Sequence, residues 1–150
     1  MPERSLTTAL GPVTLEAENG AITALHWRAG GCDDDPLLIE AARQLDAYFA
    51  GARQSFDLPL APRGSDLTRR TCAAMQAIPF GETRTFGDLA REMQVPAQAI
   101  GQACGANPIP VLIPCHRILG ASGLGGFSAK GGVETKVWLL RHEGAASLLI

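Results

Sequence analysis

The chain has 150 residues, of which 46% are hydrophobic and 19% are charged, and its formal net charge at pH 7 is −2. This composition is that of a folded soluble protein, and no apolar run approaches the ~20 residues that a membrane-spanning helix needs. The N-terminus lacks the charged-then-apolar pattern of a signal peptide, so we expect a cytoplasmic protein. The length suits one domain or two small subdomains that share a core.

The charges and the cysteines are distributed unevenly along the chain. Residues 1–64 carry five Arg and nine Asp or Glu, whereas residues 65–150 carry eight Lys or Arg and six Asp or Glu. A modest basic face on the second half is one interpretation, and an ordinary solvated surface is the other. The four cysteines show no Cys-x-x-Cys spacing, and His26 and Cys32 have no further ligand at metal spacing, so we predict no metal site.

The first 64 residues predict an N-terminal subdomain with a small antiparallel sheet and one helix. Three segments, 6–10, 13–17 and 21–27, alternate as short strands do, and Asn19-Gly20 is typical of a tight hairpin turn. Pro36 opens a helical pattern that Gly51 ends. A further strand is expected at 56–60, before a Pro- and Gly-containing linker that marks the subdomain boundary.

Residues 65–150 predict a mainly helical C-terminal subdomain, so the expected fold class is α+β. A first helix starts after an N-cap at Ser65 or Asp66 and ends before Pro79. A last helix is expected at 133–142. Its inward positions are expected to be Val133, Val137 and Leu140.

Between these helices, two short helices joined by a tight turn predict a helix-turn-helix of winged-helix type. Thr85 and Asp88 form a capping box for the first, which runs through Met93, and Pro96 suits the first position of the second. The second helix has no Lys or Arg on its outward face, so it cannot make the bidentate guanine contact of a major-groove reader. It suits a close, sequence-neutral approach to a narrow groove, and two packed helices without nucleic acid are the alternative. The outward residues are Ala97, Gln98, Gly101 and Gln102.

The segment Pro114-Cys115-His116-Arg117 is the strongest candidate for a reactive site. An apolar run, 111–113, predicts a buried strand that leads into it, and a glycine-rich loop, 120–132, follows. Asn107 precedes a proline, and an Asn at such a position fixes a turn through bonds to nearby backbone groups.

The Cys-His pair favours thiol chemistry, because a cysteine is nucleophilic only as its thiolate. Neighbouring side chains on an extended segment point to opposite faces, so contact between Cys115 and His116 needs a turn or a bridging water. Glu143 is the best-placed acid to orient the imidazole. Weaker candidates are Glu82, Asp88 and Glu92. A buried structural cysteine beside a core histidine is the alternative interpretation.

Five motifs occur together between about residues 67 and 144. They are Ile78-Pro79-Phe80-Gly81-Glu82-Thr83, Asn107-Pro108, Pro114-Cys115-His116-Arg117, the glycine loop from Gly123 to Gly132, and Lys136-x-Trp138-Leu139-Leu140-x-His142-Glu143-Gly144. In this combination they resemble the O6-alkylguanine-DNA alkyltransferase family, the methylated-DNA–protein-cysteine methyltransferases. The Pro-Cys-His-Arg motif in this context is highly specific, whereas residues 1–60 are consistent with the family's variable N-terminal subdomain and add little.

The resemblance implies direct-reversal repair of O6-alkylguanine in double-stranded DNA. The guanine would be flipped out through the minor groove, and Cys115 of a monomeric protein would accept the alkyl group once, without a cofactor. The resemblance also implies a proton network of Cys115, a water, His116 and Glu143, with Asn107 bracing the turn beneath the cysteine. Residues expected to contact the base or the DNA are Phe86, Ala97, Gln98, Gly101, Arg117, Ser128 and Lys130.

Two departures from the family's pattern concern how the base is presented. Phe86 stands where the family usually has Tyr, and it cannot donate a proton toward the leaving guanine. Gln98 stands where the family usually has an Arg that fills the vacated base stack. Because extruding a paired base costs free energy, weaker filling should slow repair of duplex DNA. Lys130 lies in a loop that is longer than the short form found in the family. One interpretation is that it aids phosphate contact or thiolate formation, and the other is that it is an ordinary solvated lysine.

Two other functions stay open at this point. A protein that binds alkylated DNA with weak transfer would recruit other repair factors. A Cys-His hydrolase would need an oxyanion hole and a larger cleft, for which the sequence shows no separate signal.

Overall fold

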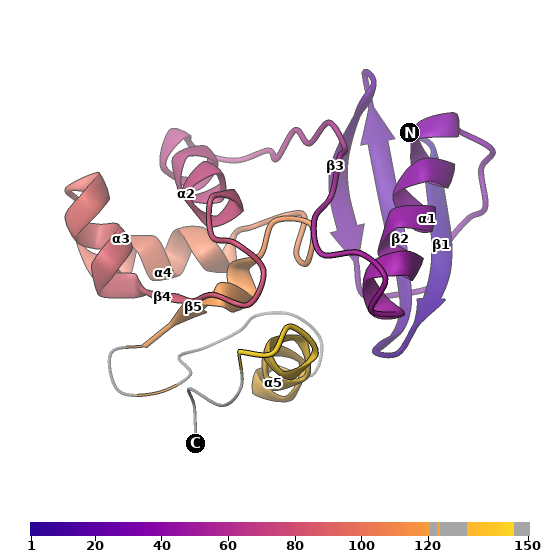
Figure 1. The fold of residues 1–150 in the computed structure, drawn as a ribbon. Helices are drawn as coiled ribbons and strands as arrows, with labels where there is room; N and C mark the ends of the chain where they lie inside the picture. The colour runs from indigo at the N-terminus through magenta and orange to yellow at the C-terminus, as the bar shows by residue number, and fades with distance from the viewer. Residues whose placement is uncertain (121–122, 124–131, 146–150) are drawn as a thin grey trace. The chain divides into compact units, whose positions relative to one another are not determined.

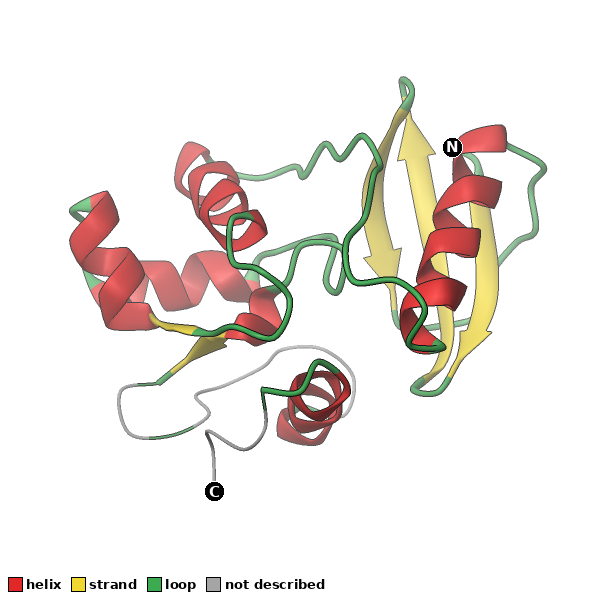
Figure 2. Cartoon of the chain, in the orientation of Figure 1, coloured by secondary structure: helices red, strands yellow, loops and turns green. Residues whose placement is uncertain are grey.

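The structure, a computed structural model, describes residues 1–120, 123 and 132–145, and the chain forms two compact units, Met1–Arg63 and Gly64–Ile150 (Figure 1). The first unit combines a sheet with one helix, and the second is mainly helical, which confirms the α+β class (Figure 2). Each unit has its own buried apolar side chains. They include Leu15, Ile22, Leu38 and Leu45 in the first unit, and Met75, Leu89, Ile100, Ile113 and Leu139 in the second.

A three-stranded antiparallel sheet, in the order β1-β2-β3, forms the base of the first unit. Its strands are β1 (Glu3–Thr8), β2 (Gly11–Glu18) and β3 (Ala21–His26). Asn19 and Gly20 connect β2 to β3 with φ values of 52° and 78°. Positive φ at both positions is the geometry of a tight hairpin turn, so the predicted hairpin is confirmed.

The helix α1 (Pro36–Phe49) packs on this sheet (Figure 1). Asp35 caps it, because its carboxylate accepts hydrogen bonds from the amides of Leu37 and Leu38 at 2.9 and 3.2 Å. Gly51 follows with a φ of 81°, which lets the chain leave the helix where the sequence predicted.

The strand expected at 56–60 is wrong. Leu60 forms only an isolated bridge with Ile22, in which the amide of Ile22 donates to the carbonyl of Pro59 at 2.8 Å. Because Pro59 has no amide hydrogen, this segment cannot extend a regular ladder.

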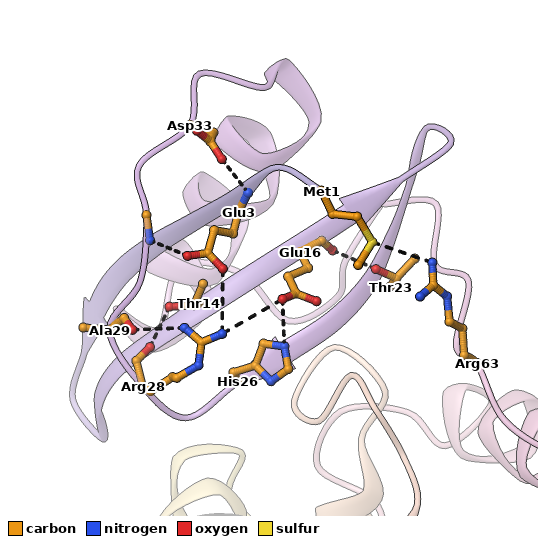
Figure 3. Close-up of polar contacts among 11 residues, drawn as sticks. Met1, Glu3, Thr14, Glu16, Thr23, His26, Arg28, Ala29, Asp33 and Arg63 are labelled. Carbon is orange, nitrogen blue, oxygen red and sulfur yellow. Dashed lines mark hydrogen bonds and ion pairs between the residues drawn. The ribbon is translucent and has the colours of Figure 1, made fainter.

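Polar contacts tie the loop after β3 to the sheet (Figure 3). The carboxylate of Glu3 accepts a hydrogen bond from the amide of Gly31 at 2.7 Å. Arg28 lies 3.7 Å from Glu3, and His26 lies 3.2 Å from Glu16. His26 thus contacts a carboxylate, and across the part of the chain that the structure describes no three His, Cys, Asp or Glu side chains are grouped to hold a metal ion.

Helices dominate the second unit. They are α2 (Asp66–Gln76), α3 (Phe86–Met93), α4 (Ala97–Gly105), the single 3-10 turn η1 (Cys115–Arg117) and α5 (Val133–His142). Two very short strands, β4 (Arg84–Thr85) and β5 (Ile118–Leu119), pair in parallel. Strands of two residues are too short to show alternation, so the sequence did not predict this pairing. No helix among the described residues is long and apolar enough to span a bilayer.

The helices α3 and α4 pack against each other through the connection that the sequence predicted. Thr85 and Asp88 form the reciprocal capping box, with hydrogen bonds of 2.9 and 3.0 Å. Gln94 ends α3 in the left-handed conformation, with a φ of 58°. Pro96 is the extended N-cap of α4 rather than its first helical residue, which corrects the expected start by one position.

The bounds of α5 match the prediction, but its buried face differs. Val133, expected to face inward, is 45% exposed, whereas Lys136, Leu139 and Leu140 are buried. Positions 136, 139, 140 and 143 follow the i, i+3, i+4, i+7 spacing of one helix face. This face therefore carries Lys136 and Glu143 into the interior of the unit.

Candidate active site

The chain reaches Cys115 through a tight turn, so the strand expected at 111–113 is wrong, although these residues are buried as predicted. Val111 has a φ of 72°, a conformation that β-branched residues rarely adopt. Prolines at 110 and 114 lack amide donors and interrupt any ladder. Cys115 consequently begins η1, where its amide donates to the carbonyl of Ile113 at 2.8 Å.

Asn107 holds this turn from the inside. Its Nδ2 donates to the carbonyl of Ile113 at 3.0 Å, and its Oδ1 accepts from the amide of Ile109 at 3.0 Å. Both isoleucines are fully buried, so these bonds satisfy backbone groups that water does not reach. The same Oδ1 lies 3.9 Å from the sulfur of Cys72, and Asn107 also hydrogen-bonds the side chain of Cys115.

Glu143 joins the Cys-His segment to the end of α5. Its Oε2 lies 2.7 Å from Nε2 of His116, and its two oxygens accept from Nε and Nη2 of Arg117 at 2.8 and 3.0 Å. Nη1 of Arg117 donates to the carbonyl of Ile78 at 2.6 Å. The side chains of His116 and Glu143 are 0% exposed. The acid predicted to orient His116 is therefore in contact with it.

The protonation of His116 follows from its partners. A carboxylate only accepts hydrogen bonds, so Nε2 carries the hydrogen that points to Glu143. Burial, together with the charges of Arg117 and Lys136, lowers the pKa of His116 against the opposing hydrogen bond and charge of Glu143, so the imidazole is neutral near pH 7. Nδ1 then holds a lone pair, and it has no hydrogen-bond partner within the described residues. His116 is thus a neutral base with a buried acceptor atom.

Cys115 is a buried thiol in a mixed electrostatic environment. Burial raises its pKa, whereas the hydrogen bond from Asn107 and the charge of Lys136 lower it. A buried cysteine without help would stay protonated and inert. Here the amide of Asn107 and the charge of Lys136 both oppose the effect of burial.

Lys136 is a candidate that the sequence analysis missed. Its side chain is fully buried, and Nζ donates to the carbonyl of Ile118 at 2.5 Å and lies 5.8 Å from the centre of the Phe86 ring. Burial lowers the pKa of Lys136 to about 8, and Cys115 acts in the opposite direction. The helical spacing of Lys136 to Leu139 and Glu143 indicates that it lies on the buried face of α5. This signal was outweighed by the usual tendency of lysine side chains to reach solvent.

The expected DNA-contacting residues of α4 lie on an open face. Ala97 and Gln98 are exposed. A Cβ added at Gly101 would meet no atom within 4 Å, so the backbone is accessible there. Phe86, at the start of α3, is half-buried. These positions fit the close approach that the sequence suggested.

The other expected contacts need correction or lie outside the described residues. Arg117 is only 7% exposed, and its donors go to Glu143 and to the carbonyl of Ile78, so the structure does not place it on a DNA-facing surface. The reason is that a buried carboxylate at the end of α5 takes up the guanidinium. Ser128 and Lys130 lie outside the described residues.

The protein is expected to lose stability at alkaline pH because of the thiols of Cys72 and Cys104. Burial raises the pKa of Cys72 to about 11 and that of Cys104 to about 12, from 9.0. Above pH 9 the folded state therefore binds more protons than the unfolded state, so stability present below pH 9 is lost as the pH rises toward 11. Urea unfolding across this range should show a falling midpoint.

The Cys104→Ala variant should show a shallower decline between pH 9 and 11, because one of these thiols is absent. The matched control is Cys32→Ala, which removes an exposed thiol. An undiminished slope in Cys104→Ala would contradict this account.

Two family models match the chain. The model described as 6-O-methylguanine DNA methyltransferase, ribonuclease-like domain, matches residues 3–62, and the model described as 6-O-methylguanine DNA methyltransferase, DNA binding domain, matches residues 66–145. Together they cover most of both compact units.

Individual relatives match along nearly the whole chain. The methylated-DNA–protein-cysteine methyltransferase of Methanosarcina barkeri is 46% identical over 150 residues, which cover 92% of this chain and 94% of the relative. That of Mycolicibacterium paratuberculosis is 38% identical over 161 residues, which cover 98% and 96%. The crystal structure of Mycobacterium tuberculosis OGT in complex with DNA matches with a TM-score of 0.85 and 38% identity, over 96% of this chain and 93% of that one.

Proposed function

This chain belongs to the 6-O-methylguanine DNA methyltransferase family, and we propose from that premise that it repairs O6-alkylguanine in DNA by direct reversal. The alkyl group moves to Cys115 and stays there, so each molecule acts once. The observation that carries the proposal is the neutral His116, held by Glu143 at 2.7 Å, on the same turn as a buried thiol. We further propose that the protein acts as a monomer in the cytoplasm, without a cofactor.

In the proposed reaction His116 accepts the proton of Cys115 at Nδ1, through a water. The thiolate sulfur then attacks the alkyl carbon, so that the S–C bond forms while the bond to O6 breaks. The departing guanine anion takes up one proton and becomes neutral guanine. This proton balances the one that the thiol has lost. Cys115 and His116 are the catalytic residues of this proposal.

Asn107, Arg117 and Glu143 are proposed as positioning residues. Asn107 fixes the turn before Cys115, and Glu143 fixes the tautomer and orientation of His116. Arg117 offsets the charge of Glu143 through two hydrogen bonds, which replaces the DNA contact first expected of it.

The DNA-facing surface is proposed to be α4. Its exposed residues Ala97 and Gln98, and the open backbone at Gly101, allow close approach to the minor groove of a duplex that contains the damaged base. Phe86 would pack near the flipped guanine. In this proposal residues 65–150 form the DNA-binding and alkyl-acceptor part, and residues 1–64 form the N-terminal α/β part.

Intact-mass measurement after incubation with an O6-methylguanine duplex tests the proposal. We expect a stoichiometric gain of one methyl group, and no gain in Cys115→Ser. Tight binding without any gain in mass would instead favour a protein that recognises alkylated DNA without transfer. A methyl gain that persists in Cys115→Ser would refute the assignment of the acceptor.

Gln98→Arg is expected to speed repair of duplex DNA by about tenfold, if the longer cation stabilises the extruded state by about 1.4 kcal/mol. Single-turnover rates on the duplex are compared with rates on the same damaged strand alone. The single strand needs no gap filling, so its rate should change little. Gln102→Arg adds the same charge at another exposed position of α4 and controls for general attraction to phosphate. Equal acceleration on both substrates would contradict gap filling.

A further inference from the structure

Most described cations of the second unit are buried or paired with a carboxylate. Two are buried, and two others form ion pairs at 2.6 and 2.7 Å that offset their charge. They are Arg117 and Lys136, and the pairs Arg84–Glu92 and Arg91–Asp88. Among the described residues of this unit, the exposed cations without a carboxylate at ion-pair distance are Arg69, Arg70 and Arg141.

Arg70 reaches the turn between α3 and α4. Its Nη2 donates to the carbonyl of Met93, the last residue of α3, at 3.4 Å. Arg69, by contrast, donates to the carbonyl of Gly64, before the start of α2. Carbonyls at the end of a helix lack a partner within it, and the negative end of the helix dipole favours a cation there. The guanidinium of Arg70 is therefore held at this turn while it stays exposed, and its remaining N–H groups are available to a ligand.

This turn leads into the open end of α4. Ala97 and Gln98, the first two residues of α4, are exposed, and α2 packs on the same helix (Figure 1). The four residues of chain from Met93 to Ala97 span at most about 14 Å. The minor groove of DNA is about 6 Å wide and is bordered by phosphates on both sides. A cation at this distance from a helix end that enters the groove therefore comes within reach of a phosphate on its edge.

We propose that Arg70 binds a phosphate of the DNA backbone beside the point where α4 enters the minor groove. The planar guanidinium can hold a phosphate through two parallel hydrogen bonds. Such a contact fixes the position of the protein on the duplex without reading its sequence. It also supplies electrostatic attraction, which α4 lacks because it contains no Lys or Arg. This role rests on the proposed function, in which α4 faces the DNA.

Fluorescence anisotropy with an undamaged duplex tests this contact, at salt concentrations between about 50 and 200 mM. Arg70→Gln removes the charge from an exposed side chain, and urea unfolding establishes that the variant is folded. Loss of one phosphate contact should lower the slope of log K against log[salt] by about 0.9. The affinity should fall about five- to tenfold at low salt, and equally for a duplex with O6-methylguanine, because a phosphate carries no sequence information.

Two variants separate a phosphate contact from general attraction. Arg141→Gln removes an exposed cation of α5, where no contact with DNA is proposed, and should leave the slope in place. Arg70→Lys keeps the charge and should retain the slope, although it loses the second hydrogen bond. An unchanged slope in Arg70→Gln, an equal loss in Arg141→Gln, or a lost slope in Arg70→Lys would each overturn the inference. Absence of methyl gain in the wild-type protein would refute the proposed transfer instead, since these slopes are measured on undamaged DNA.

Discussion

Glu143→Ala is expected to lower the free energy of unfolding by about 3–5 kcal/mol, which is the cost of leaving a buried charge without its partner. The variant leaves the guanidinium of Arg117 without its carboxylate partner. In the wild-type protein Glu143 contacts this guanidinium at 2.8 and 3.0 Å, and both side chains are buried. It also releases Nε2 of His116, so the imidazole loses its orientation and methyl transfer should slow by about 10²-fold. Urea unfolding and single-turnover transfer measure the two effects.

Two further variants separate the buried pair from a general effect of mutation. Glu82→Ala removes an exposed glutamate of the same unit and should change stability by no more than about 0.5 kcal/mol. The double variant Arg117→Met, Glu143→Met removes both charges. Its loss of stability should therefore be smaller than the sum of the losses in the single variants Arg117→Met and Glu143→Met. Additive effects in this cycle would show that the two side chains are not coupled.

Asn107→Ala is expected to cost about 2–4 kcal/mol of unfolding free energy, because it leaves the amide of Ile109 and the carbonyl of Ile113 without partners. Both groups belong to fully buried residues and bond Asn107 at 3.0 Å. The turn that presents Cys115 would lose its internal support, so transfer should fall along with stability. Denaturant unfolding and the transfer rate again provide the measurements.

Asn107→Asp distinguishes support of the turn from an electrostatic effect on the thiol. The carboxylate can still accept from the amide of Ile109, but it cannot donate to the carbonyl of Ile113, so stability should fall in this variant too. It places a negative charge beside Cys115, which disfavours the thiolate. The pH profile of transfer should therefore move to higher pH. A profile identical to that of the wild-type protein would show that Asn107 acts on the turn alone.

Local chemistry made several elements predictable. The capping box of Thr85 and Asp88, the Asn19-Gly20 turn and the Gly51 stop involve groups only a few residues apart, so each is encoded in a short stretch. The two helices around Gln94 and the bounds of α5 followed from such signals. The strand expected at 56–60 failed because alternating side chains do not determine which backbone groups find partners, and Pro59 has no amide hydrogen to donate.

The same limit explains the errors closest to the site. The apolar run 111–113 was correctly expected to be buried, but burial does not distinguish a strand from a turn. The left-handed Val111 depends on Asn107, whose side chain bonds the backbone on both sides of it. Such a conformation follows from the surrounding contacts rather than from the preference of valine.

By itself the sequence determined the chemistry of this protein: a thiol beside an imidazole, an acid seven residues after a lysine on the last helix, and the motifs that identify the family. Only the tertiary structure decided how the charges are paired. Arg117 turns inward to Ile78 and Glu143, 39 and 26 residues away, and Lys136 reaches Ile118 across 18 residues. The free energy of a charge depends on its burial and its partners. These come from segments that only folding brings together, so the role of each cation could not be derived from its place in the sequence.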